Sequence, residues 1–273
     1  MGTYKYYYFE AIDKPLTEQQ QEKLRGMSTR AQINARRFEN EYHWGSLSGN
    51  VGDMLKKYFD VHLYYASWGT RIIMFKIPAK TVDFSLLKQY HNNETVRITQ
   101  SDNQVIVDIT ADCEEAEEWW EESQKISKYV SFRDDLMAGD YRCLYIAWLA
   151  GYHEKSRKKV PPIPPGMKKL SGTLRSFINF MYLDEETLNT TLESASDEEL
   201  PEPTLNEIKD WIASLPDKDR QSVLVDLLVE QTPAQIIGRE LKNRFFQERK
   251  TNTPKTSCQR KQVKKLSKKR PKK

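Results

Sequence analysis

Several features that usually reveal a protein's activity are missing from this sequence. Its 11 glycines form neither a G-x-G-x-x-G pattern nor a Walker pattern, so the common phosphate-binding loops are excluded. Its three cysteines are scattered and odd in number, which is not a disulfide framework and favours a reducing, cytoplasmic location. Its four histidines show no ligand spacing with one another or with cysteine, so the sequence predicts no metal site and no cofactor.

Long apolar runs are missing as well. The longest of them, residues 143–151, has nine residues, whereas a membrane-spanning helix needs about 20. The chain also has no apolar segment of the signal-peptide type after its first residue, so we expect no secretion. The sequence therefore predicts a cytoplasmic protein that does not contact membranes.

Aromatic residues give the chain the means to form a core. Apolar residues make up 38% of the sequence and charged residues 30%, which is polar for a globular protein. Aromatic residues reach 11%, and each buries a large area, so a folded core is expected even with few aliphatic side chains. The length of 273 residues fits one large domain or two modest ones.

Residues 1–112 have the pattern of an α+β domain built on an antiparallel sheet. Helix starts are marked at Thr17, where Gln20 completes a capping-box pattern, and at Asn50. Residues 102–103 (DN) are typical of a tight hairpin turn. Strands rich in aromatic and β-branched residues are expected at residues 3–12, 31–44, 62–68, 70–77, 96–99 and 104–109.

Residues 113–200 predict a mostly helical region packed on that sheet. Residues 136–152 have the pattern of one long buried helix, with Leu144 and Trp148 on a single stripe. The four prolines among residues 161–165 cannot be helical and indicate an extended connector. Other helices are expected at residues 114–128, 170–182 and 184–192.

Residues 201–250 predict further helices. Thr204 with Glu207 is a second capping-box pattern, and Asp217 marks the start of the next helix. Thr232 followed by a proline is the preferred start of a last helix, which we expect to run to about residue 250.

The most informative segment is residues 251–273, which we expect to be a disordered basic tail. These 23 residues hold ten Lys or Arg and no Asp or Glu. Since the whole chain carries +4, residues 1–250 hold 33 basic and 39 acidic side chains, a net charge of −6. A flexible polycation binds nucleic acid without sequence preference by releasing counterions. The alternative is a solvated tail that aids solubility or contacts acidic partners.

The candidate nucleic-acid-binding residues are basic side chains of the last helix and of the tail. The last helix carries basic residues beside its apolar ones and so extends the positive surface. The tail has no aromatic residue, so neither base stacking nor sequence readout is expected from it. The candidates are Arg239, Lys242, Arg244, Lys261, Lys264, Lys265, Lys268, Lys269 and Arg270.

Glu41 and His43 form the candidate catalytic pair. On a strand they would face the same side, and a carboxylate beside an imidazole can orient it or raise its pKa for general-base chemistry. No nucleophile is tied to them in the sequence, although Ser46 is near. The alternative, which we favour, is a structural pair at a sheet edge with Trp44 in the core.

Three other patterns are better explained by structure than by chemistry. Cys143 and His153 would lie roughly 15 Å apart along one helix, too far for a catalytic pair, so Cys143 is expected in the core. The carboxylates of residues 112–122 are typical of a solvated acidic face rather than a metal site. The aromatic run at residues 4–9 could stack bases on an open sheet, but we expect a central strand that is packed on both faces.

The remaining motifs are a set of blocks spread over residues 4–246. They are residues 11–17 (AIDKPLT), 40–45 (NEYHWG), 68–71 (WGTR), 136–142 (LMAGDYR), 147–151 (AWLAG), 161–170 and 210–215. Together these blocks resemble an uncharacterised bacterial protein family. The resemblance implies a bacterial cytoplasmic protein and transfers no catalytic or binding residue. The basic tail departs from the family pattern.

The sequence therefore predicts a non-enzymatic interaction protein that contacts nucleic acid non-specifically through its basic C-terminus. One alternative is a protein-binding adaptor whose tail only aids solubility. Another is an enzyme of unrecognised type with a site near His43.

Overall fold

The computed structural model describes residues 4–101, 103–113, 126–152, 160–199 and 203–229, and in the last helix residues 234, 237, 238, 241, 242, 244–246 and 248. Most of the acidic helix expected at residues 114–128 falls outside the described residues. The turn residue Asp102 and the tail at residues 251–273 fall outside them too. Within the described ranges, none of the helices is long and apolar enough for a membrane crossing.

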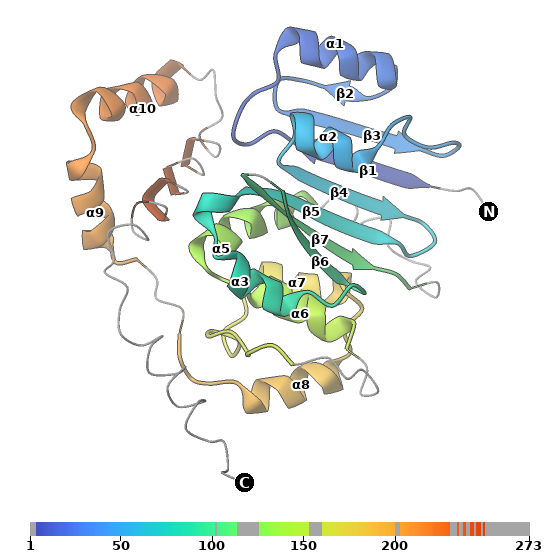
Figure 1. Ribbon diagram of the computed structural model, residues 1–273. Coiled ribbons are helices and arrows are strands. Elements are labelled where there is room, and N and C mark those ends of the chain that lie inside the picture. Colours follow the sequence, from blue (N-terminus) through green and yellow to red (C-terminus); the bar gives the residue numbers. More distant parts are fainter. Residues whose placement is uncertain are drawn as a thin grey trace.

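A seven-stranded sheet makes up the N-terminal half of the protein, and most helices lie in the C-terminal half (Figure 1). The strand order is β2-β3-β1-β4-β5-β7-β6, and every neighbouring pair is antiparallel. The predicted α+β fold is therefore confirmed. The strands are β1 (Lys5–Glu10), β2 (Gln32–Ile33), β3 (Arg37–Tyr42), β4 (Val61–Ala66), β5 (Arg71–Pro78), β6 (Val96–Ser101) and β7 (Gln104–Ala111).

β1 is a central strand that is buried on both faces. It pairs with β3 on one side and with β4 on the other. Tyr6 and Tyr8 belong to one hydrophobic cluster, and Tyr7 and Phe9 belong to the other. The aromatic run is thus a doubly packed strand, as expected, because successive side chains of a strand point to opposite faces.

Each face of the sheet is covered by a different set of helices. Tyr6 and Tyr8 pack in one core with α5 (Phe132–Ala138), α6 (Arg142–Ala150) and α7 (Gly172–Phe180). α1 (Glu18–Met27) and α2 (Val51–Tyr58) cover the other face through Leu24 and Leu55. α5, α6 and α7 therefore share their core with the sheet. The other short elements before residue 200 are η1 (Ala79–Thr81), α3 (Phe84–Leu87), η2 (Lys88–Tyr90), η3 (Ile126–Ser131) and α8 (Glu185–Ser194).

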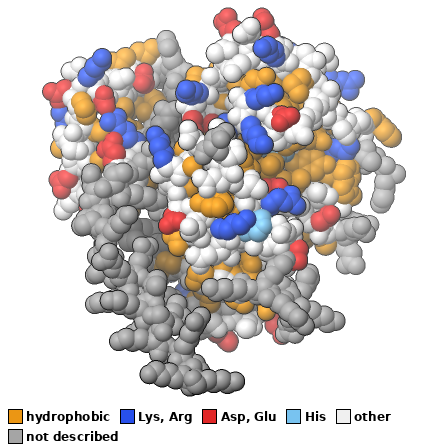
Figure 2. Space-filling model, viewed as in Figure 1, with side chains coloured by type: hydrophobic (Ala, Val, Ile, Leu, Met, Phe, Trp, Pro, Cys, Tyr) orange, Lys and Arg blue, Asp and Glu red, His pale blue; other side chains and the backbone are white. Residues whose placement is uncertain are grey.

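One end of the sheet leaves large apolar side chains exposed. Trp44 follows β3 and is 80% exposed, and Trp68 lies in the turn after β4 and is 41% exposed. Figure 2 shows hydrophobic side chains at the surface on the right of the view, where β3 and β4 end in Figure 1.

Local capping patterns correctly predicted several helix starts. At α1 the Thr17 hydroxyl accepts from the Gln20 N–H (3.3 Å), and the Gln20 side chain accepts from the Thr17 N–H (2.9 Å). Thr204 and Glu207 make the same reciprocal pair at the start of α9 (Leu205–Ser214). Both predicted capping boxes are therefore confirmed.

The single helix predicted for residues 136–152 is wrong, because the chain breaks between α5 and α6. Gly139 ends α5 with a φ of 93°, a left-handed conformation that a side chain would strain. The Asp140 carboxylate then accepts from the N–H of Arg142 (3.0 Å), where α6 begins. The apolar periodicity continues across the break, which is why the pattern alone did not reveal it.

The single strand predicted for residues 31–44 is also divided. The Asn34 side chain accepts from the N–H of Arg36 (2.8 Å), and the backbone N–H of Asn34 donates to the carbonyl of Arg37 (3.0 Å). This turn folds β2 back on β3 as a hairpin, because asparagine side chains stabilise such turns.

The outer edge of β6 is closed by the segment before it. The Asn92 side chain accepts from the N–H of Val96 (2.8 Å), and His91 Nδ1 accepts from the N–H of Ile98 (2.9 Å). Lys88 Nζ donates to the carbonyl of Ile98 (3.3 Å). An edge strand whose backbone groups are already bonded does not add a further strand there.

Arg71 connects β5 to the end of α7. Its side chain is fully buried, and Nη1 donates to the carbonyls of Asn179 (3.1 Å) and Phe180 (2.9 Å). The guanidinium also lies 3.8 Å from the ring centroid of Tyr182. A cation at the C-terminal end of a helix is favourable because the helix dipole is negative there.

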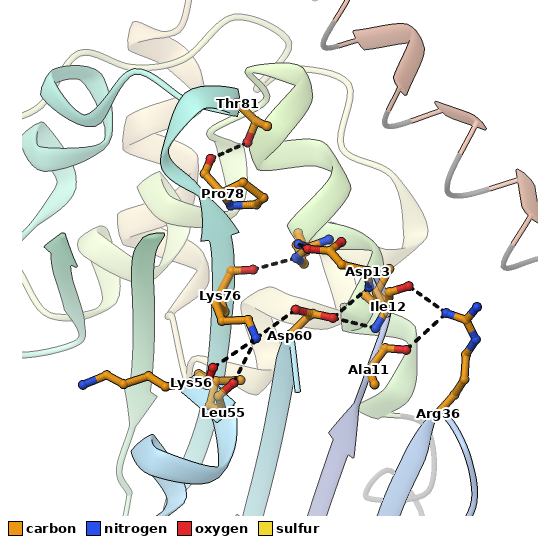
Figure 3. Close-up of polar contacts among 11 residues, drawn as sticks. Ala11, Ile12, Asp13, Arg36, Leu55, Lys56, Asp60, Lys76, Pro78 and Thr81 are labelled. Atoms are coloured by element: carbon orange, nitrogen blue, oxygen red, sulfur yellow. Dashed lines mark hydrogen bonds and ion pairs between the residues drawn. The ribbon is translucent and has the colours of Figure 1, made fainter. Parts of the chain in front are cut away.

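Asp60, at the start of β4, organises a second polar cluster at the opposite end of the sheet from the two tryptophans (Figure 3). Its Oδ2 accepts from the N–H groups of Ile12 (2.7 Å) and Asp13 (2.8 Å), and its Oδ1 lies 3.2 Å from Lys76 Nζ. Arg133 of α5 extends the cluster, because Nε donates to the Lys76 carbonyl (2.8 Å) and Nη2 to the Asp13 carboxylate (2.7 Å).

We expect Asp60→Ala to lower the free energy of unfolding by about 3–5 kcal/mol. The change leaves the Lys76 ammonium without its carboxylate, and two backbone donors lose their acceptor. Chemical denaturation measures the effect. Asp197→Ala is the control, because Asp197 pairs with Lys168 at the exposed surface and its loss is expected to have little effect. Equal effects of the two changes would contradict a structural role for the Asp60 cluster.

Candidate functional site

A cleft of about 700 Å³ opens between the α5–α6 junction and the C-terminal helices. Most of its lining is apolar and comes from α9 and from the described residues of the last helix. The apolar side chains are Ile208, Trp211, Ile212, Leu241, Phe245 and Phe246, with Ala138, Pro165 and Pro203, and the charged ones are Asp135, Asp140, Arg142 and Lys242.

The wall formed by α9 follows from the spacing of its apolar residues. Ile208, Trp211 and Ile212 lie three and four positions apart, so they share one face of the helix. The Trp211 ring contacts Phe245 edge to face at 5.4 Å, and its Nε1 donates to Glu248 Oε2 (2.8 Å). Trp211 thereby holds α9 against the last helix and gives the cleft its aromatic wall.

The charged groups of the cleft largely pair with one another. Arg142 Nη2 lies 2.7 Å from the Asp140 carboxylate, and Arg142 also donates to the carbonyls of Gly166 (3.2 Å) and Lys169 (2.9 Å). These bonds hold the segment that follows the prolines against the start of α6. Arg142 is therefore engaged in structure rather than free to bind an anion.

Asp135 is a carboxyl group of the cleft whose pKa is shifted toward neutral pH. Burial first, and then the charge of Asp140, raise the pKa of Asp135 to about 6, while Lys242 opposes the shift from 4.0 Å. Since the folded protein holds this proton more tightly than the unfolded chain, the group favours folding at low pH. That contribution is lost as the pH rises from about 4 to about 6.

The structure places two of the predicted nucleic-acid-binding residues against acidic partners. Lys242 faces Asp135, as above, and Arg244 lies 2.7 Å from Asp219 of α10 (Asp217–Val229) and 2.9 Å from Glu248. Both cations therefore take part in packing the last helix. The other predicted residues, which are Arg239, Lys261, Lys264, Lys265, Lys268, Lys269 and Arg270, lie outside the described residues.

Glu41 and His43 do not form a strand pair. Glu41 is exposed on β3 opposite Tyr6, whereas His43 lies beyond the end of that strand, and its ring packs 5.4 Å from Tyr4. The prediction that Trp44 is in the core is wrong, because the strand ends before it and the alternation of faces no longer applies. Neither Glu41 nor His43 lines the cleft.

Cys143 is a core residue, as predicted. It is buried in α6, and burial raises the pKa of its thiol well above the ordinary value, so the reactive thiolate is disfavoured. The proposed partner His153 lies outside the described residues. In the described part of the chain, no group of three or more His, Cys, Asp or Glu side chains is arranged to hold a metal ion.

Comparison with known proteins gives no relative. No protein-family model, no curated protein and no solved structure matches this chain. The resemblance to a bacterial family therefore stays a prediction, and the cleft has to be interpreted from its own chemistry.

The sequence predicted both helices that form the cleft but not the cleft itself. The usable signal was an aromatic residue on the apolar face of each helix, Trp211 and Phe245. Periodicity shows which face of a helix is apolar, but it does not show what that face contacts.

We expect Lys242→Met to raise the pKa of Asp135 further, because the substitution removes the cation that opposes the shift. Carboxyl NMR titration measures the midpoint. Lys168→Met is the control, because it should raise the pKa of Asp197, which Lys168 lowers, and leave Asp135 unchanged. An unmoved Asp135 midpoint in Lys242→Met would show that the last helix does not pack over α5.

Proposed function

We propose that this chain is a non-enzymatic, cytoplasmic interaction protein whose cleft binds an apolar segment of a protein partner. The observation that carries the proposal is the aromatic and aliphatic lining of the cleft between two helices. Apolar grooves between helices bind amphipathic helices through residues at positions i, i+3, i+4 and i+7.

The polar groups of the cleft favour a protein segment over a small polar molecule. Small-molecule sites use a few directed polar groups to orient the ligand. Here Asp140 and Arg142 bind one another, and burial raises the pKa of Asp135 and so disfavours its charged form. Few groups are left to orient a polar ligand, whereas apolar contact needs none.

The neighbouring helix adds to the apolar surface of this region. α10 has no buried residue, and it exposes Leu224 (59%) and Leu228 (83%). Exposed apolar patches on a protein surface are typical of interaction sites. The C-terminal helices therefore resemble a docking region more than a second core.

A displayed library of short peptides tests the proposal. We expect full-length protein to enrich peptides with Leu, Ile, Phe or Trp at helical spacing, and Ile212→Asp to weaken their binding about tenfold or more. Ile212 lines the cleft and is 46% exposed, so the fold should tolerate the change. Fluorescence anisotropy of a labelled peptide gives the affinity.

Val160→Asp is the matched control, because it places the same charge on an exposed apolar residue that neither lines the cleft nor belongs to the C-terminal helices. It should leave peptide affinity unchanged. Equal losses in the two variants, or no enrichment of apolar peptides, would reject the cleft as the binding site.

The second candidate function is non-specific contact with nucleic acid through the basic C-terminus. Ten basic and no acidic side chains in the last 23 residues favour it. Lys242 and Arg244 pair with acidic side chains of the fold, which supports the tail as the source of the phosphate contacts.

We expect full-length protein to bind duplex DNA, single-stranded DNA and RNA with a steep salt dependence, and a protein of residues 1–250 to lose that binding. Binding across a salt series gives the number of phosphates contacted. Unchanged binding by the shortened protein would place the contacts elsewhere, and no binding by either protein would reject this function.

A further inference from the structure

Trp44 and Trp68 stand out because two exposed indole rings lie at the same end of the sheet. Among the described residues of the sheet half, 4–101 and 103–113, they are the large apolar side chains recorded as exposed. In contrast, Phe9, Phe38 and Phe75 of the same half are fully buried. Within these residues, the exposure of large apolar side chains is therefore confined to the ends of β3 and β4.

The strand register brings the two tryptophans to either side of Lys5. Lys5 of β1 lies opposite Tyr42 of β3 and opposite Ala66 of β4. Trp44 comes two residues after Tyr42, and Trp68 comes two residues after Ala66. Both tryptophans therefore lie at the same end of the sheet, just beyond the two strands that flank β1. Neighbouring strands are about 4.8 Å apart, so the two chains emerge roughly 10 Å from each other.

Lys5 links the two segments directly. Its Nζ donates to the carbonyl of Gly45 (2.7 Å) and to the hydroxyl of Ser46 (2.5 Å), and it lies 5.4 Å from the ring centroid of Trp68. One ammonium thus holds the loop that carries Trp44 and contacts the ring of Trp68.

The turn that carries Trp68 is held in place by backbone constraints as well. Gly69 has a φ of 96°, and a Cβ at this position would lie 1.8 Å from the carbonyl oxygen of Cys113. The Tyr182 hydroxyl donates to the Gly69 carbonyl (3.2 Å). The turn next to Trp68 therefore has a fixed shape, which lowers the entropy lost when a ligand stacks on the ring.

We propose that Trp44 and Trp68 form a stacking site for the bases of single-stranded nucleic acid. This inference rests on the proposed nucleic-acid function, in which the tail supplies the charge and has no aromatic residue to stack on a base. Indole rings stack on any base, and they reach base faces only where the strand is unpaired.

The surroundings of the two rings fit this ligand better than a protein surface. The polar groups near them include Lys5, Ser46 and the exposed His43. The Asp112 carboxylate accepts from the hydroxyl of Thr70, two residues after Trp68. Exposed aromatic rings beside a cation are typical of sites that stack bases along a phosphate backbone. A contiguous aliphatic patch, as on α10, is typical of protein docking.

Binding of full-length protein to a short single-stranded oligonucleotide and to its duplex tests the inference. We expect Trp44→Ala and Trp68→Ala each to weaken single-strand binding about tenfold and to leave duplex binding unchanged. Trp44→Phe should restore part of the loss, because phenylalanine also stacks. Leu228→Ala, which shortens an exposed side chain on α10, is the matched control and should change neither affinity.

The possible outcomes distinguish failure of the stacking site from failure of the proposed nucleic-acid function. Full single-strand affinity in both tryptophan variants, with binding still dependent on the tail, would overturn the stacking site and leave the tail function standing. Equal losses on single strand and duplex would also overturn stacking. No binding of any nucleic acid by the unaltered full-length protein would overturn both.

Discussion

The polar cluster around Asp60 is the contact on which the arrangement of the sheet and its helices depends. One carboxylate accepts two backbone N–H groups that follow β1 and pairs with Lys76 of β5. Arg133 then ties the same strand to α5 through the Lys76 carbonyl. Because buried charges are costly unless paired, this cluster admits one arrangement of β1, β4, β5 and α5.

Arg71 has the complementary role on the same strand, because it binds the carbonyl end of α7. Two buried arginines therefore join β5 to the helical half. Arg71 binds the end of α7, and Arg133 of α5 binds the Lys76 carbonyl. The aromatic packing around Tyr129, Phe132 and Phe177 fills the space between these anchors. The sheet and α5–α7 consequently behave as a single core.

The surfaces proposed to bind partners lie outside that core. α9 and α10 have no buried residue, and the two exposed tryptophans project from the end of the sheet remote from Asp60. Binding residues on loops and peripheral helices can change their contacts without disturbing core packing. The proposed recognition elements therefore lie at the margins of a packed core.

Local chemistry explains which elements the sequence determined by itself. Capping boxes at Thr17 and Thr204, the aromatic strand β1 and the buried position of Cys143 depend on neighbours within a few residues, so their patterns were sufficient. The charge contrast between body and tail is likewise a property of composition alone.

The tertiary structure decided the features that depend on contacts between residues far apart in the chain. The pairing of Arg244 with Asp219 and the exposure of Trp44 depend on where a second segment packs or a strand ends. Periodicity carries no information about such partners, because it reports only which face of an element is apolar.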